Sequence, residues 1–251
     1  MKTRITDGKK YLALFIAFSF FLCASLTLLI ALGSRMANEP SRSQTEDSES
    51  EREDLTGGVI VVIDAGHGGE DGGAVGRNGA LEKDINLSLA LTLSDALEAM
   101  GVATLLTREE DILLYDKSSD YQGQKKAQDL AERRRIAESC ENAIFVSIHM
   151  NSFPEEKYKG LQVYYSENNE ESMTLAKRIQ SLTAESLQPE NNRQCKSGGN
   201  IYLLERLTCP AILIECGFLS NAEECELLST EEYRQSLARL IATAIYGYLA
   251  N

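Results

Sequence analysis

The chain has 251 residues and a formal net charge of −13 at pH 7, which limit its architecture and its partners. Residues 57–251 alone carry 18 basic and 30 acidic side chains, so the acidity belongs to this stretch itself. Nucleic-acid binding needs a basic surface against the phosphates, and the charge therefore argues against a nucleic-acid partner. The length of residues 57–251 suits one well-packed domain and is short for two.

An apolar run without a charged side chain covers residues 11–33. At about 1.5 Å per residue, a helix of this length can cross a hydrocarbon core of about 30 Å. Four basic residues precede the run, namely Lys2, Arg4, Lys9 and Lys10. Only Arg35 follows closely, so the positive-inside bias places residues 1–10 in the cytoplasm and the rest of the chain outside. We expect a transmembrane anchor; the alternative is a cleavable signal peptide, which would leave the protein secreted.

Residues 34–56 form an acidic linker between this run and the rest of the chain. From Ala37 to Leu55 there are seven acidic and two basic residues and hardly any apolar side chains. Such a segment cannot bury a hydrophobic core, so we expect a disordered tether.

Strand and helix patterns alternate through residues 57–251. Strand-like runs fall at 59–64, 102–107, 143–149, 160–165 and 211–216, with a short run at 201–204. Helical periodicity covers 84–100, 128–140, 170–187 and 231–249. No period is visible from Tyr115 to Lys126, which predicts a surface loop. The order predicts an α/β fold: one domain with a mostly parallel, twisted sheet and helices on both faces.

Only two histidines occur in the chain, and each ends an apolar, strand-like run. His67 follows the run that begins at Val59, and His149 ends the run that begins at Ala143. Open α/β sheets build their sites at the carboxyl ends of strands, and histidine is the commonest neutral metal ligand. The two imidazoles are therefore placed to converge on one metal ion.

A glycine-dense loop from Gly68 to Gly79 follows His67 and permits close approach of the backbone to a bound group. A phosphate-binding loop is an alternative, but the segment lacks the Gly-Lys-Ser/Thr ending of such loops. Glu82 follows at the start of the next helix. Taken alone, Glu82 would be a first-turn acid favoured by the helix dipole.

A second carboxylate, Glu215, lies at the end of the apolar strand at 211–216. An unpaired charge is expensive to bury there, and a nearby cation would remove that cost. Two histidines and one glutamate leave an open position for water on zinc, while a glutamate that does not bind the metal can move the proton of that water. Cys216 points to the opposite face of the strand, and we assign it to the core.

Four motifs, in this order, resemble the zinc-dependent N-acetylmuramoyl-L-alanine amidases of bacterial cell walls, the family also called amidase type 3. The motifs are Ile63-Asp64-Ala65-Gly66-His67-Gly68-Gly69, Gly79-Ala80-Leu81-Glu82-Lys83, Ser147-Ile148-His149-Met150-Asn151-Ser152 and Ile214-Glu215-Cys216-Gly217-Phe218-Leu219-Ser220-Asn221. The resemblance implies that His67, Glu82 and His149 bind one Zn²⁺ and that Glu215 is the catalytic carboxylate. Arg133 matches an arginine that we interpret as structural.

The implied reaction is hydrolysis of the amide between the lactyl group of N-acetylmuramic acid and L-alanine of the peptidoglycan stem peptide. Glu215 would accept a proton from the attacking water and return it to the L-alanine nitrogen. Two alternatives stay open: another zinc peptidoglycan hydrolase, such as a stem-peptide peptidase, and a cell-wall binding module that has lost catalysis.

Leu114-Tyr115-Asp116, the Gln-Lys-Lys loop at 124–126, the tether and the anchor resemble the sporulation branch called CwlD. This branch implies action on spore-cortex peptidoglycan, before muramic-δ-lactam formation, in the forespore intermembrane space. It also implies an activating lipoprotein partner. Glu205 departs from the family, because relatives often carry a basic residue at this position.

Overall fold

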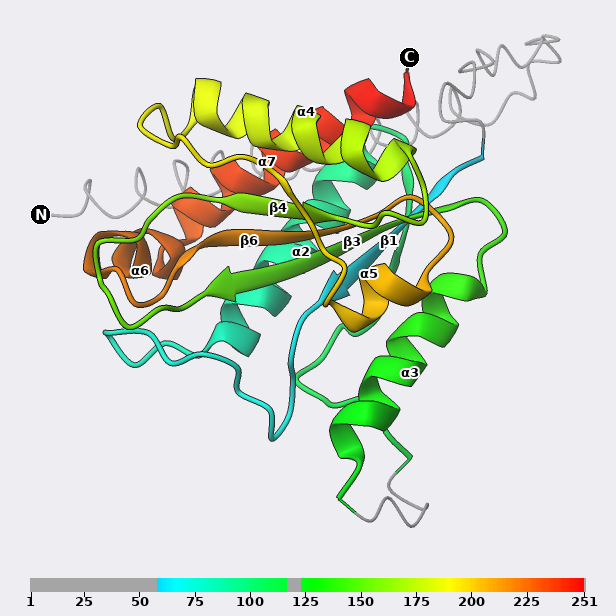
Figure 1. The fold of residues 1–251 in the computed structure, drawn as a ribbon, viewed down its shortest axis with the longest axis horizontal. Coiled ribbons are helices and arrows are strands. Elements are labelled where there is room, and N and C mark those ends of the chain that lie inside the picture. Colours follow the sequence, from blue (N-terminus) through cyan, green and yellow to red (C-terminus); the bar gives the residue numbers. More distant parts are fainter. Residues whose placement is uncertain (1–57, 117–122, 251) are drawn as a thin grey trace, which may run out of the picture. The chain divides into compact units, whose positions relative to one another are not determined.

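The computed structural model describes residues 58–116 and 123–250 (Figure 1). The predicted anchor at 11–33 and linker at 34–56 lie outside these ranges. Within these ranges, no helix is both long enough and apolar enough to cross a membrane. The structure therefore informs the predicted α/β domain, while the anchor and the linker stay predictions.

Six strands form one sheet in the order β2-β1-β3-β6-β4-β5. Their bounds are β1 (Ile60–Ala65), β2 (Ala103–Leu106), β3 (Ala143–Asn151), β4 (Gln162–Tyr165), β5 (Lys196–Ser197) and β6 (Ala211–Phe218). Strands β2, β1, β3 and β6 run parallel, whereas β4 is antiparallel to β6 and β5 is parallel to β4. The predicted mostly parallel sheet is confirmed.

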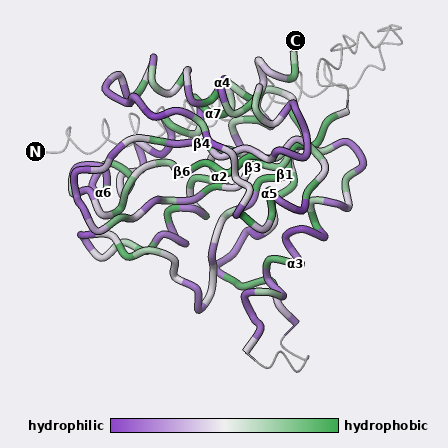
Figure 2. Tube along the Cα trace, in the orientation of Figure 1, coloured by the Kyte–Doolittle hydropathy of each residue, from purple (hydrophilic) through white to green (hydrophobic). Residues whose placement is uncertain are grey.

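The two faces of the sheet carry separate hydrophobic cores, as the period of two along a strand requires. Val61 and Ile63 of β1 pack into the larger core, and Val62 packs into the smaller one. Because both faces are covered, the central strands are continuous apolar runs. Figure 2 shows these hydrophobic residues along the central strands and hydrophilic residues along α3 and the loops.

Helices cover both faces, as predicted (Figure 1). The larger core receives the buried residues of α2 (Glu82–Ala99), α4 (Glu171–Ser186), α6 (Ala222–Ser229) and α7 (Glu231–Leu249). The smaller core receives those of α3 (Lys125–Glu138) and α5 (Tyr202–Arg206). Helix α5 has only five residues and buries Leu203 and Leu204.

The structure differs from the predicted elements at α5, at the start of α3, at α6 and at β5, a strand of two residues with no predicted counterpart. Residues 201–204 were predicted as a strand, but α5 begins at Tyr202. Leu203 and Leu204 are adjacent and both pack into the smaller core, whereas neighbours in a strand would point to opposite faces. Lys125 and Lys126 belong to α3 rather than to the predicted loop.

Helix α6 has no counterpart among the predicted helices. Its N-cap is Asn221, whose side chain accepts a hydrogen bond from the backbone N–H of Glu224. This is the expected chemistry of a helix start, because an N-cap side chain satisfies one of the free N–H groups of the first turn.

Candidate metal centre and catalytic carboxylate

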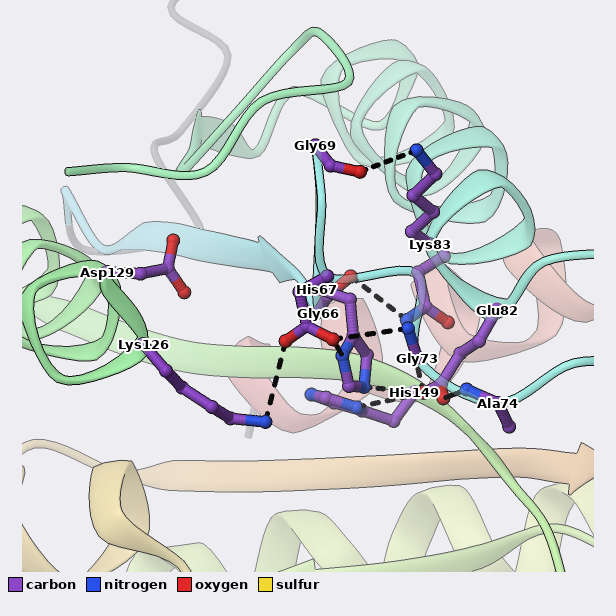
Figure 3. A network of polar contacts seen from close by, with 12 residues as sticks. Gly66, His67, Gly69, Gly73, Ala74, Glu82, Lys83, Lys126, Asp129 and His149 are labelled. Atoms are coloured by element: carbon purple, nitrogen blue, oxygen red, sulfur yellow. Dashed lines mark hydrogen bonds and ion pairs between the residues drawn. The ribbon is translucent and has the colours of Figure 1, made fainter. Parts of the chain in front are cut away.

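Both histidines and Glu82 meet at the carboxyl ends of β1 and β3. His67 follows β1, His149 lies in β3, and Glu82 is the first residue of α2. One ligand atom from each of the three side chains lies within 4.8 Å of the other two. The Oε1 atom of Glu82 is 3.3 Å from His67 Nε2 and 3.1 Å from His149 Nδ1 (Figure 3). The structure thus brings together the three residues that the sequence predicts as metal ligands.

The surroundings of Glu82 keep its side chain in the charged form that a metal ligand needs. Burial alone would raise the pKa of Glu82, but hydrogen bonds and charges from His149 and His67 lower it below the ordinary value. The backbone N–H groups of Ala74 and Met150 donate to this carboxylate at 2.8 and 3.0 Å. Two imidazole nitrogens and one carboxylate oxygen are a donor set that suits zinc and leaves a position for water.

The turn after β1 has two special residues: His67 has an unusual φ, and Gly66 leaves room for the ring of His149. His67 has a φ of 61°, which is uncommon outside glycine. A Cβ atom built on Gly66 would lie 2.2 Å from the ring of His149. A side chain at residue 66 would therefore displace this ring, and glycine is required by space rather than by its own φ.

Arg133 of α3 holds this turn from the face of the smaller core. Its side chain is 2% exposed and donates to the carbonyl oxygens of Ala65 and His67, each at 2.7 Å. The guanidinium also pairs with Asp64 at 2.6 Å and Asp129 at 2.8 Å. These contacts agree with the structural role that the sequence suggests for Arg133.

Arg108, which follows β2, is a second buried arginine at the same turn. It donates to the carbonyl oxygens of Ala65 at 2.9 Å and Gly66 at 3.0 Å. It also donates at 2.9 Å to the carbonyl oxygen of Lys83, the residue after Glu82. Arg108 thus joins the segment that carries one predicted ligand to the segment that carries another.

Glu215 lies beside the three converging side chains, on β6. It pairs with His149 in the β3–β6 ladder, so both side chains project from the same face of the sheet. Its Oε2 atom is buried and has no hydrogen-bond partner in the described part of the chain. Burial raises the pKa of Glu215, and the charge of Glu82 adds to this rise. The geometry therefore places a basic carboxylate next to the candidate metal ligands.

Cys216 lies on the opposite face from Glu215. It is fully buried in the larger core, which confirms the assignment of Cys216 to the core.

Sequence reasoning gave no role to Asp71 or Gln162. A carboxylate oxygen of Asp71 lies 3.0 Å from His67 Nδ1, close enough for an ion pair, although this nitrogen makes no hydrogen bond in the described part of the chain. Gln162 pairs with Glu215 on the neighbouring antiparallel strand β4. No local pattern marks Gln162, because its position depends on the pairing of distant strands.

Comparison with known proteins identifies the family. The chain matches the family model of N-acetylmuramoyl-L-alanine amidases over residues 61–246. It is 37% identical over 191 residues to the germination-specific N-acetylmuramoyl-L-alanine amidase of Bacillus subtilis strain 168, and the match covers 76% of this chain and 80% of that protein.

Solved structures agree with the sequence match. The CwlD amidase from Clostridioides difficile, solved in complex with the GerS lipoprotein, is 40% identical with a TM-score of 0.72, and the match covers 76% of this chain and 98% of that one. The amidase AmiC2 of Nostoc punctiforme is 34% identical with a TM-score of 0.65, covering 77% of this chain and 98% of that one. The chain therefore belongs to the N-acetylmuramoyl-L-alanine amidase family of peptidoglycan hydrolases, in its CwlD branch.

Proposed function

We propose that this amidase is zinc-dependent and cuts the bond between the lactyl group of N-acetylmuramic acid and L-alanine of the stem peptide. The convergence of His67, Glu82 and His149, with Glu215 paired to His149 across the sheet, carries the proposal. The three converging side chains would hold one Zn²⁺, and a bound zinc ion would supply polarisation of a water molecule and of the scissile carbonyl.

Glu215 is the proton carrier in this proposal. Its buried, unpartnered oxygen is free to accept a proton from the attacking water and to return it to the L-alanine nitrogen as the amide bond breaks. The raised pKa of Glu215 makes it a stronger base than an exposed glutamate. Arg108 and Arg133 hold the turn that carries His67, and Asp71 lies beside its ring.

The zinc-loaded full-length protein and defined muramoyl peptides provide the test. We expect products with free L-alanine amino termini on intact stem peptides, measured by mass spectrometry. Cleavage within the stem would instead indicate the peptidase alternative, and zinc binding without any cleavage would indicate a binding module. His67→Ala should lose both zinc and cleavage, while Glu215→Gln should lose cleavage alone.

We also propose that the enzyme acts on spore-cortex peptidoglycan, before muramic-δ-lactam formation. The similarity to a germination-specific amidase supports this role. Removal of the stem peptide by this enzyme would supply the muramic acid from which the lactam forms. The proposal predicts that spores without this enzyme contain no muramic-δ-lactam in their cortex; a normal lactam content would contradict it.

The proposed location follows from the apolar run at 11–33. This run would anchor the protein in the membrane with the catalytic domain outside the cytoplasm, in the forespore intermembrane space. Cell fractionation with amino-terminal sequencing would distinguish the anchor from a cleaved signal peptide, which would give a secreted protein.

A lipoprotein partner is a further proposal, supported by the C. difficile amidase that was solved in complex with the GerS lipoprotein. A rise in cleavage rate or zinc affinity on addition of such a lipoprotein would support it.

A further inference from the structure

Three aromatic side chains and one arginine contact one another in a row that includes Phe218, the last residue of β6. The ring centroids of Phe153 and Tyr158 are 5.0 Å apart in an edge-to-face contact, and those of Tyr158 and Phe218 are 6.4 Å apart. The guanidinium carbon of Arg193 lies 4.5 Å from the ring centroid of Phe218. We call these four residues the aromatic row.

A β-bulge places Phe218 on the same face of the sheet as the metal centre. His149 pairs with Glu215, but Asn151 pairs with Phe218, so β6 has one extra residue in this interval. A bulge re-aims the side chains that follow it. By this register, Phe218 shares the face of Asn151, which is also the face of His149.

Arg193 connects the aromatic row to the proposed proton carrier. Its Nη1 atom donates to the side-chain oxygen of Gln162 at 2.8 Å, and Gln162 pairs with Glu215 in the sheet. Its Nε atom donates at 2.8 Å to the carbonyl oxygen of Lys159. The aromatic row therefore has Arg193, which contacts the strand partner of Glu215, at one end and Phe153 at the other.

The outer end of the row is exposed, whereas its inner end is buried. Phe153 is 48% exposed and Tyr158 is 36% exposed, but Phe218 is only 3% exposed. The backbone N–H of Phe153 donates to the side-chain oxygen of Ser220 at 3.0 Å, which fixes the loop to the segment after β6. Paired aromatic rings that stay exposed beside a reaction centre are suited to contact a ligand.

Charged side chains surround the two exposed rings, and Nζ of Lys157 lies 5.3 Å from the ring centroid of Tyr158. Glu156 pairs with Arg77, and Lys159 pairs with Glu190 at 2.9 Å. A stem peptide carries carboxylates that would meet Lys157 here, so affinity for a free stem peptide is the discriminating measurement. An N-acetylated sugar is neutral, and its ring presents C–H groups to an aromatic face and hydroxyl groups to the phenol of a tyrosine.

We propose that Phe153 and Tyr158 bind a sugar of the glycan strand, next to the muramic acid whose amide bond is cut. This inference rests on the proposed function, because it takes the substrate to be a glycan that carries stem peptides. The aromatic row would make the enzyme prefer a muramic acid within a strand over an isolated muramoyl peptide.

The test measures binding of a peptidoglycan tetrasaccharide without stem peptides to the zinc-loaded full-length protein. This probe has no scissile amide, so its binding does not depend on catalysis. We expect the double variant Phe153→Ala, Tyr158→Ala to lose affinity about tenfold. The matched control is Tyr202→Ala on α5, a tyrosine that is also 36% exposed and lies against Arg206. The control should bind like the wild type.

Two results would overturn the inference: equal affinity of the double variant and the wild type for the tetrasaccharide, or an equal loss of affinity for a free stem peptide. Zinc content and circular dichroism of the variants show that the comparison is between folded, loaded proteins. Cleavage of an isolated muramoyl peptide by the wild type is measured separately. If the wild type does not cleave this peptide, the proposed function is contradicted. If tetrasaccharide binding is the same with and without the two rings, only the inference is contradicted.

Discussion

Two carboxylates on the same face of the sheet have opposite surroundings. Asp64 of β1 is 1% exposed, and both of its oxygens accept hydrogen bonds: Arg133 and Thr107 donate to one at 2.6 and 2.8 Å, and Ser147 donates to the other at 2.6 Å. Glu215 of β6 has a buried oxygen without a partner in the described ranges. Asp64 therefore has a structural role in the site, while the carboxylate of Glu215 is available to react.

The pKa directions of the two groups follow from this difference. Burial would raise the pKa of Asp64, but Arg133 and Ser147 outweigh it, and the pKa is lowered. Burial raises the pKa of Glu215, and the opposing effect of the histidines does not cancel it. Carboxylates whose surroundings push their pKa values apart have different roles, so hydrogen bonding distinguishes a structural acid from a reactive one here.

The largest expected effect comes from Glu215→Gln, which removes the reactive carboxylate and keeps its shape. Because general acid–base catalysis contributes about 10²- to 10⁴-fold, we expect cleavage of muramoyl peptides to fall about a thousandfold. Zinc content should stay the same, since Glu215 is not one of the converging ligands. Near-normal turnover of this variant would contradict its proposed role.

Removing the partner of the structural carboxylate should instead reduce stability. Arg133→Met leaves Asp64 and Asp129 buried without their cation, and we expect the free energy of unfolding to fall by about 3–5 kcal/mol. Urea denaturation measures this loss. The control is Arg135→Met on the same helix, because the Arg135 side chain is 68% exposed and water screens its ion pair with Glu132, so this variant should lose far less stability. Similar losses of unfolding free energy in the two variants would show that the buried ion pairs of Arg133 contribute no more than the exposed pair of Arg135.

Arg108→Met tests whether the frame positions the metal ligands. Arg108 joins the turn that bears His67 to Lys83, next to Glu82. We expect zinc affinity to fall about tenfold, as for residues that orient metal ligands through hydrogen bonds. Competition with a chelator of known affinity provides the measurement, again with Arg135→Met as the control. A folded Arg108→Met variant with unchanged zinc affinity would show that the turn holds its shape alone.

The smallest effect concerns the stability of the metal-free protein. A glutamate whose folded-state pKa is raised above 4.5 costs folding free energy when the pH is above that raised pKa, and costs nothing when both states are protonated. Metal-free Glu215→Gln should therefore be more stable than the metal-free wild type near pH 8, and the difference should vanish near pH 4. Thermal unfolding across this pH range measures the difference. A difference in stability that does not change with pH would contradict the assignment.

The sequence was sufficient to predict the fold class and the residues that converge. Apolar runs that end in His67, His149 and Glu215 mark carboxyl ends of strands, and the ends of parallel strands meet at one edge of a sheet. The short segment at 201–204 was predicted wrongly because a brief apolar run fits a strand and a buried helical turn equally well. Helix α6 had a signal in Asn221 and Glu224, which resembles a capping box.

The aromatic row and the arginine contacts had no such signal. The position of Phe218 depends on a bulge between β3 and β6, and a bulge is a property of two paired strands rather than of either sequence. Arg108 acts through backbone carbonyl groups, which every residue has. Neither contact leaves a pattern of side chains that spacing alone can detect.

The convergence of residues 67, 82 and 149 also bears on the stability of the fold. An ion held by three side chains so far apart along the chain would bind only where folding has brought them together, so binding would stabilise the folded state. The melting temperature of the enzyme would then rise with the concentration of free zinc. Metal supply would in this way govern how long the enzyme survives as well as how fast it works.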